Sequence, residues 1–278
     1  MVYVIYNPLS CGGHGEERKD SALVELNKKY KEITVVDFTK TDIDFFKSLN
    51  ADDILILVGG DGTLNTFINL YKDYATNNKC YLFKGGNGND FLRDIDANEQ
   101  LSLLNPYLEN LPYVVVNGMK KYFINNVGFG IDGETCVVAD TKKANGKKKI
   151  NYSNIAVGLL LHKYKRRNAR VIVDGKEYTF KNIWIAATMN GRFYGGGMKC
   201  APDQNRLSKT VSVVVIHGFS RIKTLIKFSK IFKGTHVKYE KNVKVLVGNE
   251  IEVFFDEPCG LQYDGESIQK TNHYTVCK

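Results

Sequence analysis

The feature that most constrains the fold is a short apolar run that stops at a glycine-rich turn. Residues 54–58 read Ile-Leu-Ile-Leu-Val, and residues 59–63 read Gly-Gly-Asp-Gly-Thr. A continuous apolar run of this length fits a strand that is buried on both faces, as in a parallel sheet covered by helices. The glycines after it allow a sharp turn and a close approach of the backbone to a ligand. The segment therefore predicts a strand–loop–helix unit with a binding loop.

The first 117 residues repeat this alternation of strand and helix patterns. Strands are predicted over residues 2–6, 33–38, 54–58 and 80–83. Helices are predicted over residues 21–30, 43–49, 63–74 and 101–108. Such an alternation predicts an α/β domain over residues 1–117, with an open, mostly parallel sheet and helices on both faces.

Strand patterns dominate from residue 118 onward. They cover residues 122–127, 169–173, 178–180, 183–189, 211–216, 243–247 and 251–255. Asp174-Gly175 between two of these runs predicts a hairpin. Two helices are expected, over residues 152–165 and 219–232. We expect a β-sandwich domain over residues 118–270. The last residues, about 271–278, belong either to this domain or to the first one.

Composition excludes several classes of protein. The 278 residues are 43% hydrophobic and 25% charged, which argues against disorder, collagen and a disulfide scaffold. No apolar run approaches the roughly 20 residues that cross a bilayer. The first residues, 1–6, predict a strand and not a signal peptide. The six cysteines are scattered without a C-x-x-C pair, which is typical of reduced thiols in a cytoplasmic protein.

The net charge of +9 favours anionic partners such as nucleotides, nucleic acid or acidic lipid headgroups. Residues 219–232 combine Phe, Ile and Leu with Lys and Arg at helical spacing. Such a helix either lies on an anionic membrane surface as a peripheral element or packs its apolar face on the sandwich. Nucleic acid is not expected as a partner, because the acidic residues in the glycine loops would repel phosphodiesters.

Three glycine-containing loops each follow a predicted strand of the first domain. They cover residues 7–15, 59–65 and 85–93. The carboxyl ends of parallel strands meet at one edge of a sheet, so these loops are expected to line one ligand crevice. Backbone amides in such loops and at helix starts bind phosphate groups.

These loops resemble the diacylglycerol kinase catalytic domain family, which includes bacterial diacylglycerol/lipid kinases, sphingosine kinases and ceramide kinases. The resemblance is carried by Asn7-Pro-x-Ser10, by Gly59-Gly60-Asp61-Gly62-Thr63-Leu64-Asn65 and by Gly86-x-Gly-Asn89-Asp90-Phe-x-Arg93. Later segments are similar as well, namely 123–132, 190–202 and 263–266. The similarity covers nearly the whole chain in the right order.

The resemblance implies an NAD-kinase-like nucleotide-binding domain and a lipid-substrate domain, with the active site between them. It implies ATP and Mg²⁺ as cofactors, and the residues implied at the nucleotide are Asn7, Ser10, Gly59, Gly60, Asp61, Gly62, Thr63, Asn65, Gly86, Asn89, Asp90 and Arg93. Asp61 and Asp90 would also hold the metal. Asp264 would be the general base for the lipid hydroxyl, with Asp61 as the second catalytic residue.

The function that the resemblance implies is transfer of the γ-phosphate of ATP to diacylglycerol or a similar neutral lipid, giving phosphatidate or the equivalent lipid phosphate. The enzyme would be cytoplasmic and peripheral at the inner face of the membrane. An NAD kinase-like enzyme and a non-catalytic nucleotide- or lipid-binding regulator are the alternatives. Asn117 stands where the family usually has Asp, and no Asp-Asp-Gly turn follows Pro202. The lipid acceptor and a homodimer are left open.

Overall fold

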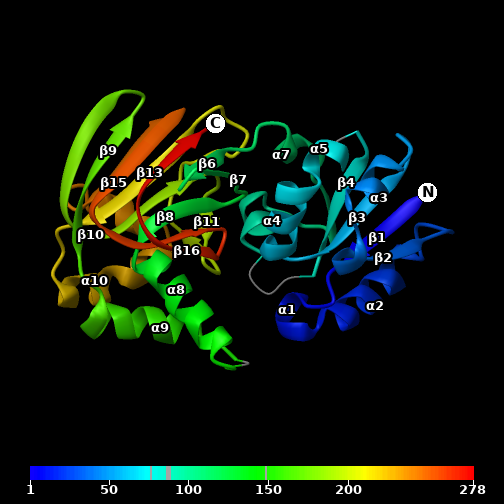
Figure 1. The fold of residues 1–278 in the computed structure, drawn as a ribbon, viewed down its shortest axis with the longest axis horizontal. Helices are drawn as coiled ribbons and strands as arrows, with labels where there is room; N and C mark the ends of the chain where they lie inside the picture. The colour runs from blue at the N-terminus through cyan, green and yellow to red at the C-terminus, as the bar shows by residue number, and fades with distance from the viewer. Residues whose placement is uncertain (76, 86–88, 148) are drawn as a thin grey trace. The chain divides into compact units, whose positions relative to one another are not determined.

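The computed structural model describes residues 1–75, 77–85, 89–147 and 149–278, which form two compact units, residues 1–111 and 112–278 (Figure 1). The sequence patterns put the boundary at residue 117. In the structure β6 (Tyr113–Val116) pairs with β16 (Glu266–Cys277) and belongs to the second unit. Residues 271–277 also lie in the second unit, because β16 pairs there with both β6 and β15 (Glu250–Tyr263).

The first unit contains a five-stranded sheet in the order β2-β1-β3-β4-β5. Its strands are β1 (Val2–Tyr6), β2 (Thr34–Asp37), β3 (Ile54–Gly59), β4 (Lys79–Lys84) and β5 (Leu101–Leu103). The first four strands of this order pair in parallel and β5 pairs antiparallel to β4. The predicted parallel-dominated sheet is confirmed.

Alternate residues of the central strands face different helices. Val4, Ile56 and Val58 form one apolar cluster with Ala22 and Leu26 of α2 (Gly15–Leu26). The helices α3 (Ile43–Lys47), α4 (Asp61–Leu70) and α5 (Lys72–Ala75) complete the strand–helix alternation. Their aromatic rings pack together, and Phe46 stacks on Tyr71 with ring centroids 4.1 Å apart.

The predicted helix over residues 101–108 is wrong. Leu101–Leu103 forms β5, and only Asn105–Leu108 forms a helix, α7. Pro106 lies in the first turn of α7, where its missing N–H removes no helical hydrogen bond. The predicted helix over residues 63–74 begins earlier, at Asp61, and breaks at Tyr71 into α4 and α5.

The second unit contains a nine-stranded sheet in the order β14-β13-β10-β8-β15-β16-β6-β7, with β9 paired to both β10 and β15. The remaining bounds are β7 (Met119–Tyr122), β8 (Asn126–Gly130), β9 (Arg167–Val173), β10 (Lys176–Met189), β13 (Val211–His217) and β14 (Val243–Gly248). Because β8 and β9 each bridge β10 and β15, the sheet closes around one apolar core that includes Phe129, Val171 and Tyr274. This confirms the predicted β-rich second domain.

The predicted hairpin at Asp174-Gly175 joins β9 to β10, with φ of 47° and 80°. Positive φ at both positions is what a type I′ turn requires. The two strands predicted over residues 178–180 and 183–189 are one strand, β10, whose register shifts between Phe180 and Ile183.

The sequence patterns predicted neither α8 (Ile131–Ala144) nor β16. The stripe of α8 that is buried contains the small residues Cys136 and Ala139, which give a weak helical signal. The strand β16 carries many polar residues and has no continuous apolar run.

Three helices cover one side of the strands in the second unit: α8, α9 (Tyr152–Gly158) and α10 (Arg221–Phe228) (Figure 1). The helix predicted over residues 152–165 continues past α9 as a π-helical turn, η2 (Leu159–Lys163). The helix predicted over residues 219–232 is α-helical only in α10, and a 3₁₀ turn, η3 (Ser229–Ile231), follows. Within the described residues, no helix is both long enough and apolar enough to cross a membrane.

The contact between α8 and β15 depends on two glycines. A Cβ on Gly133 would overlap the carbonyl oxygen of Gly260, so the helix and the strand touch through their backbones. We expect Gly133→Ala to lower the free energy of unfolding by about 1–3 kcal/mol, because neither backbone can move cheaply. In α9, Gly158 has open space around it, so Gly158→Ala is the matched control and should be neutral or stabilising by up to about 1 kcal/mol. Urea unfolding checks this, and equal stabilities of the two variants would contradict it.

Candidate functional site

The strand order of the first unit identifies where a ligand of such a sheet binds. The strands β2 and β3 lie on opposite sides of β1. The connections after β1 and after β3 therefore lead in opposite directions along the sheet, and the topological switch point lies between these two strands. Open α/β sheets bind ligands in the crevice at the carboxyl ends of the strands beside such a switch point. The loops that contain Asn7 and Asp61 leave β1 and β3 at this place.

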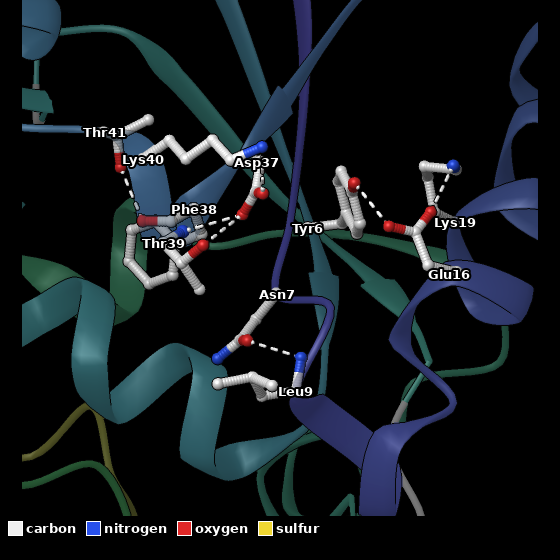
Figure 2. Close-up of polar contacts among 10 residues, drawn as sticks. All are labelled: Tyr6, Asn7, Leu9, Glu16, Lys19, Asp37, Phe38, Thr39, Lys40 and Thr41. Atoms are coloured by element: carbon white, nitrogen blue, oxygen red, sulfur yellow. Dashed lines mark hydrogen bonds and ion pairs between the residues drawn. The ribbon is translucent and has the colours of Figure 1, made fainter.

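The loop after β1 forms a tight turn. Asn7 Oδ1 accepts the N–H of Leu9 at 2.9 Å, and the Asn7 carbonyl accepts the N–H of Ser10 at 3.0 Å (Figure 2). Ser10 begins the short helix α1 (Ser10–Gly13). Gly15 lies against the Asn7 carbonyl with no room for a Cβ, so α2 starts directly against the turn. The Asn7 side chain therefore shapes the loop.

Charged side chains beside this loop are paired within the unit (Figure 2). Glu16 accepts hydrogen bonds from Tyr6 Oη at 2.7 Å and from Lys19 Nζ at 2.6 Å. The hydrogen bond to Glu16 is the main cause of the raised pKa of Tyr6. At the end of β2, Asp37 accepts the N–H and the hydroxyl of Thr39, and the hydroxyl contact is the main cause of the lowered pKa of Asp37.

In the loop after β3, the backbone at Gly59 lies close to the side chain of Thr63. A Cβ on Gly59 would overlap the side chain of Thr63, so the chain can enter α4 here only with glycine. Gly60 is the extended residue before the helix, and the exposed Gly62 lies in its first turn. Thr63 and Asn65 are buried in α4. The start of this ten-residue helix presents backbone N–H groups that lack helical partners.

Asp61 connects this loop to the loop after β4. Its carboxylate accepts the N–H of Asp90 at 2.8 Å and the N–H of Phe91 at 3.1 Å, at the start of α6 (Asp90–Asp94). Asp90 is buried, and its Oδ1 accepts Nη1 of Arg93 at 2.7 Å. The structure thus brings Asp61, Asp90 and Arg93 together, as expected of one site.

Asn89 precedes α6 and adopts a left-handed conformation with φ of 42°. The predicted site residue Gly86 lies outside the described residues, as do Asn87 and Gly88. The described residues of the third loop are Gly85 and residues 89–93, and the N–H of Asp90 contacts Asp61 there.

Asp61 and Asp90 fit the requirements of a nucleotide-bound Mg²⁺. This ion keeps several waters and uses one or two carboxylates together with substrate phosphates. The backbone N–H of Asp90 contacts the carboxylate of Asp61, and the carboxylate of Asp90 is paired with Arg93. In the described part of the chain, no three His, Cys, Asp or Glu side chains gather into a metal site. The pair would therefore share the ion with phosphate oxygens.

Asp264 lies in the second unit, at the turn between β15 and β16. Its φ is 46° and that of Gly265 is 92°, so the predicted Asp-Gly pair does form a hairpin turn. The carboxylate accepts three backbone N–H groups, from Ile124 at 2.6 Å, Asn125 at 2.8 Å and Asn126 at 3.1 Å. Such charge-assisted bonds hold an ionised carboxylate in one orientation.

A buried arginine contacts the segment that Asp264 holds. Arg206 donates to the carbonyl of Ile124 and to Oδ1 of Asn125, both at 3.1 Å. The half-buried Lys278 donates in turn to the carbonyl of Arg206 at 2.6 Å, and burial lowers the pKa of Lys278 to about 8. The sequence patterns indicated a site role for neither residue. The only signal for Arg206 was its position just after the Ala201-Pro202 segment.

The second unit also contains a small apolar cavity, with a volume of about 60 Å³. Leu160 of η2 and Leu225 and Phe228 of α10 form its sides, and Trp184 also lines it. His236 lines it as well, and burial lowers the pKa of His236 to about 4, so this ring is neutral near pH 7.

No sequence pattern predicted this cavity, because its lining residues are spread from Ile131 to Val243. The one ammonium group among them belongs to Lys227, and it lies over the ring of Tyr239, 3.5 Å from the ring centroid. The lining therefore suits an uncharged, apolar ligand.

Asp132 begins the first turn of α8 with a buried carboxylate oxygen. In the described part of the chain its Oδ1 has no hydrogen-bond partner, and burial raises the pKa of Asp132 to about 6. Gln262 donates to the other oxygen at 3.4 Å. Carboxyl groups with shifted pKa values concentrate at functional sites. Asp132 lies in the family-like segment 123–132, and the motifs predicted no role for it.

The chain thus joins an α/β unit, with acidic glycine loops at its switch point, to a closed β-rich unit, and a known family model matches each of the two parts. Residues 1–109 match the diacylglycerol kinase catalytic domain. Residues 125–277, more than half of the chain, match the YegS C-terminal NAD kinase beta sandwich-like domain. The chain belongs to the family that the YegS C-terminal domain model describes, and a diacylglycerol kinase catalytic domain precedes this domain, which confirms the resemblance drawn from its motifs.

Named relatives agree with this family. The diacylglycerol kinase of Mycobacterium tuberculosis (strain ATCC 25618 / H37Rv) is 24% identical over 256 residues, which cover 86% of this chain and 81% of the relative. The “Putative lipid kinase YtlR” of Bacillus subtilis (strain 168) is 24% identical over 243 residues, covering 78% and 75%. A crystal structure of a “putative diacylglycerol kinase from Bacillus anthracis str. Sterne” has the same fold, with a TM-score of 0.71 at 18% identity, covering 100% and 92%.

The buried carboxyl of Asp132 makes stability depend on pH. Its pKa rises from an ordinary 3.8 to about 6 on folding, so the stability that it contributes is full below about pH 4 and lost as the pH rises through about 6. We expect Asp132→Asn to be more stable than wild type by about 2 kcal/mol near pH 8, and similar near pH 4. Urea unfolding across this range measures it, with the exposed Asp203→Asn as control. Parallel curves for wild type and Asp132→Asn would contradict the expectation.

Proposed function

We propose that the protein is a lipid kinase that transfers the γ-phosphate of ATP to the hydroxyl of diacylglycerol or a similar neutral lipid, at an anionic membrane surface. The product is phosphatidate or the equivalent lipid phosphate. The observation that carries the choice of a lipid is the apolar cavity of the second unit, whose buried His236 is neutral. The family supports the phosphoryl transfer.

The nucleotide is proposed to bind at the loops of the first unit. The start of α4 offers backbone N–H groups to the phosphates, and Gly59, Gly60 and Gly62 allow a close approach. The other proposed nucleotide residues are Asn7, Ser10, Thr63, Asn65, Gly86, Asn89, Asp90 and Arg93. Bound Mg²⁺, held by Asp61 and Asp90, supplies neutralisation of the phosphate charge.

Asp264 is proposed as the general base that accepts the proton of the lipid hydroxyl. Three backbone N–H groups orient its carboxylate, which suits a base that must point at one oxygen atom. In the same proposal, the first unit binds the nucleotide and the second unit binds the lipid. The sequence patterns divide the two domains as residues 1–117 and 118–270, whereas the compact units of the structure are residues 1–111 and 112–278.

The structure gives a local reason for the Asn at position 117. Asn117 and Gly118 join β6 to β7 with φ of 49° and 76°, the conformation in which Asn-Gly turns are favoured. Asn117 Oδ1 also accepts the hydroxyl of Thr271 at 3.2 Å. The departure from Asp is thus compatible with an active kinase, although it also suits the alternative of a non-catalytic regulator.

An assay with radiolabelled ATP separates the candidates. The panel is diacylglycerol, a monoacyl lipid, a sphingoid base, a polyprenol and NAD, each with magnesium. We expect a neutral lipid to gain the label. Labelled NADP would replace the proposal with an NAD kinase-like activity, and nucleotide binding without any labelled product would replace it with a regulator.

The role of Asp264 has a matched control within the chain. Asp174 is also a left-handed hairpin aspartate, and its carboxylate accepts the N–H groups of Asn249 and Glu250, each at 2.9 Å. We expect Asp264→Asn to lower kcat by about 10²–10⁴-fold and Asp174→Asn to leave it within about twofold. Thermal unfolding reports the structural cost of each variant. Equal losses of kcat in the two variants would argue against a general base.

Two substitutions distinguish a catalytic role of Asp61 from its structural contact with the start of α6. Asp61→Ala removes the acceptor for the Asp90 and Phe91 N–H groups and should cost about 1 kcal/mol of stability, whereas Asp61→Asn keeps one acceptor oxygen. Both should lower phosphoryl transfer by at least about 10²-fold. Asp42→Asn is the control, since Asp42 also accepts an N–H at a helix start, from Phe45 at 3.0 Å. Full activity of Asp61→Asn would refute the assignment.

A further inference from the structure

The helix α10 has two apolar sides. Its inner side, with Thr224 and Phe228, lines the cavity. Its outer side carries Ile222 and Ile226, one helical turn apart, which are 73% and 68% exposed. Of the two alternatives for this helix, packing on the strands therefore accounts for the inner side only, and the isoleucine pair needs another explanation.

Neighbouring residues extend this apolar outer side. Arg221 donates to the carbonyls of Leu160 and Tyr164 at 2.7 and 2.8 Å, which fastens the start of α10 to η2. The α9–η2 segment itself exposes Val157 and Leu161. We call the set Val157, Leu161, Ile222, Leu225 and Ile226 the α10 surface. Val157 and Leu225 also line the cavity, so the α10 surface borders the cavity.

The charged side chains of α10 and of the residues beside it in the sequence have one sign. Residues 218–239 contain Arg221, Lys223, Lys227, Lys230, Lys233 and Lys238 and no Asp or Glu. Of these side chains, Lys223, Lys230, Lys233 and Lys238 are exposed. An apolar helix side with lysines around it is typical of a helix that lies at the boundary of headgroups and acyl chains.

We propose that the α10 surface docks on an anionic lipid bilayer, with Ile222 and Ile226 inserted at the headgroup boundary, and that acyl chains enter the cavity between η2 and α10. The entry route rests on the proposed lipid kinase function, whereas the docking does not. A second copy of the chain fits this surface poorly, because its lysines would face lysines and the isoleucine pair is far smaller than a stable dimer interface.

The docking is tested by sedimentation with vesicles of phosphatidylcholine alone or mixed with phosphatidylglycerol. Wild type should bind the mixed vesicles and release as salt is raised. Ile222→Glu combined with Ile226→Glu should weaken the binding by about tenfold or more. The control is Val24→Glu on α2, an equally apolar helix residue that is 63% exposed, and it should bind as wild type does.

A second variant guards against misfolding of the first. Lys223→Gln combined with Lys230→Gln leaves the apolar residues in place and should weaken binding by about fivefold for each lysine. Wild-type binding by both variants would overturn the docking surface. Equal binding of wild type to neutral and mixed vesicles would overturn its electrostatic part.

Activity separates the entry route from the function itself. The substrates are long-chain diacylglycerol in mixed vesicles and a short-chain diacylglycerol that dissolves as a monomer. The Ile222→Glu, Ile226→Glu variant should lose the first activity and keep the second, and loss of both equally would overturn the proposed route. Vesicle binding by a wild type that labels no lipid would sink the kinase proposal and leave the docking in place.

Discussion

The candidate nucleotide site depends on one contact, between the carboxylate of Asp61 and the backbone N–H groups of Asp90 and Phe91. This contact joins the loop after β3 to the start of α6, and the N–H of Gly85 also bonds the carbonyl of Gly59 at 3.3 Å. Because the link is made by an acceptor at a helix start, α6 begins where the Asp90 backbone meets Asp61 and the Asp90 carboxylate meets Arg93. Each of the two carboxylates is therefore held by its own donors.

In the second unit an aspartate also accepts backbone N–H groups of a distant segment. The Asp264 carboxylate accepts three successive backbone N–H groups, and Arg206 donates to the same segment. In both units an acidic motif residue organises the backbone as well as offering chemistry. A substitution there changes the architecture and the reactivity together, which is why variants that keep an acceptor are more informative than alanine.

The apolar features of the second unit belong together in a similar way. One helix, α10, supplies wall residues to the cavity on one side and exposed isoleucines on the other. In the proposed docking, this single helix would separate the bilayer from the cavity. The close contact of Gly133 with Gly260 holds α8 against β15 elsewhere in this unit. The close backbone contact is therefore between α8 and β15, whereas the exposed isoleucines are on α10.

The sequence by itself determined the features whose signals are local: the buried strand 54–58, the glycine loops after β1, β3 and β4, the Asp174-Gly175 hairpin and the family motifs. Only the tertiary structure decided that residues 101–103 form a strand, because a short apolar run becomes a strand when a neighbour such as β4 offers hydrogen bonds. The same holds for the hydrogen bond between Asp264 and Ile124, 140 residues apart, and for the cavity. Burial and convergence are properties of distant segments packed together, and they leave no periodicity in the sequence.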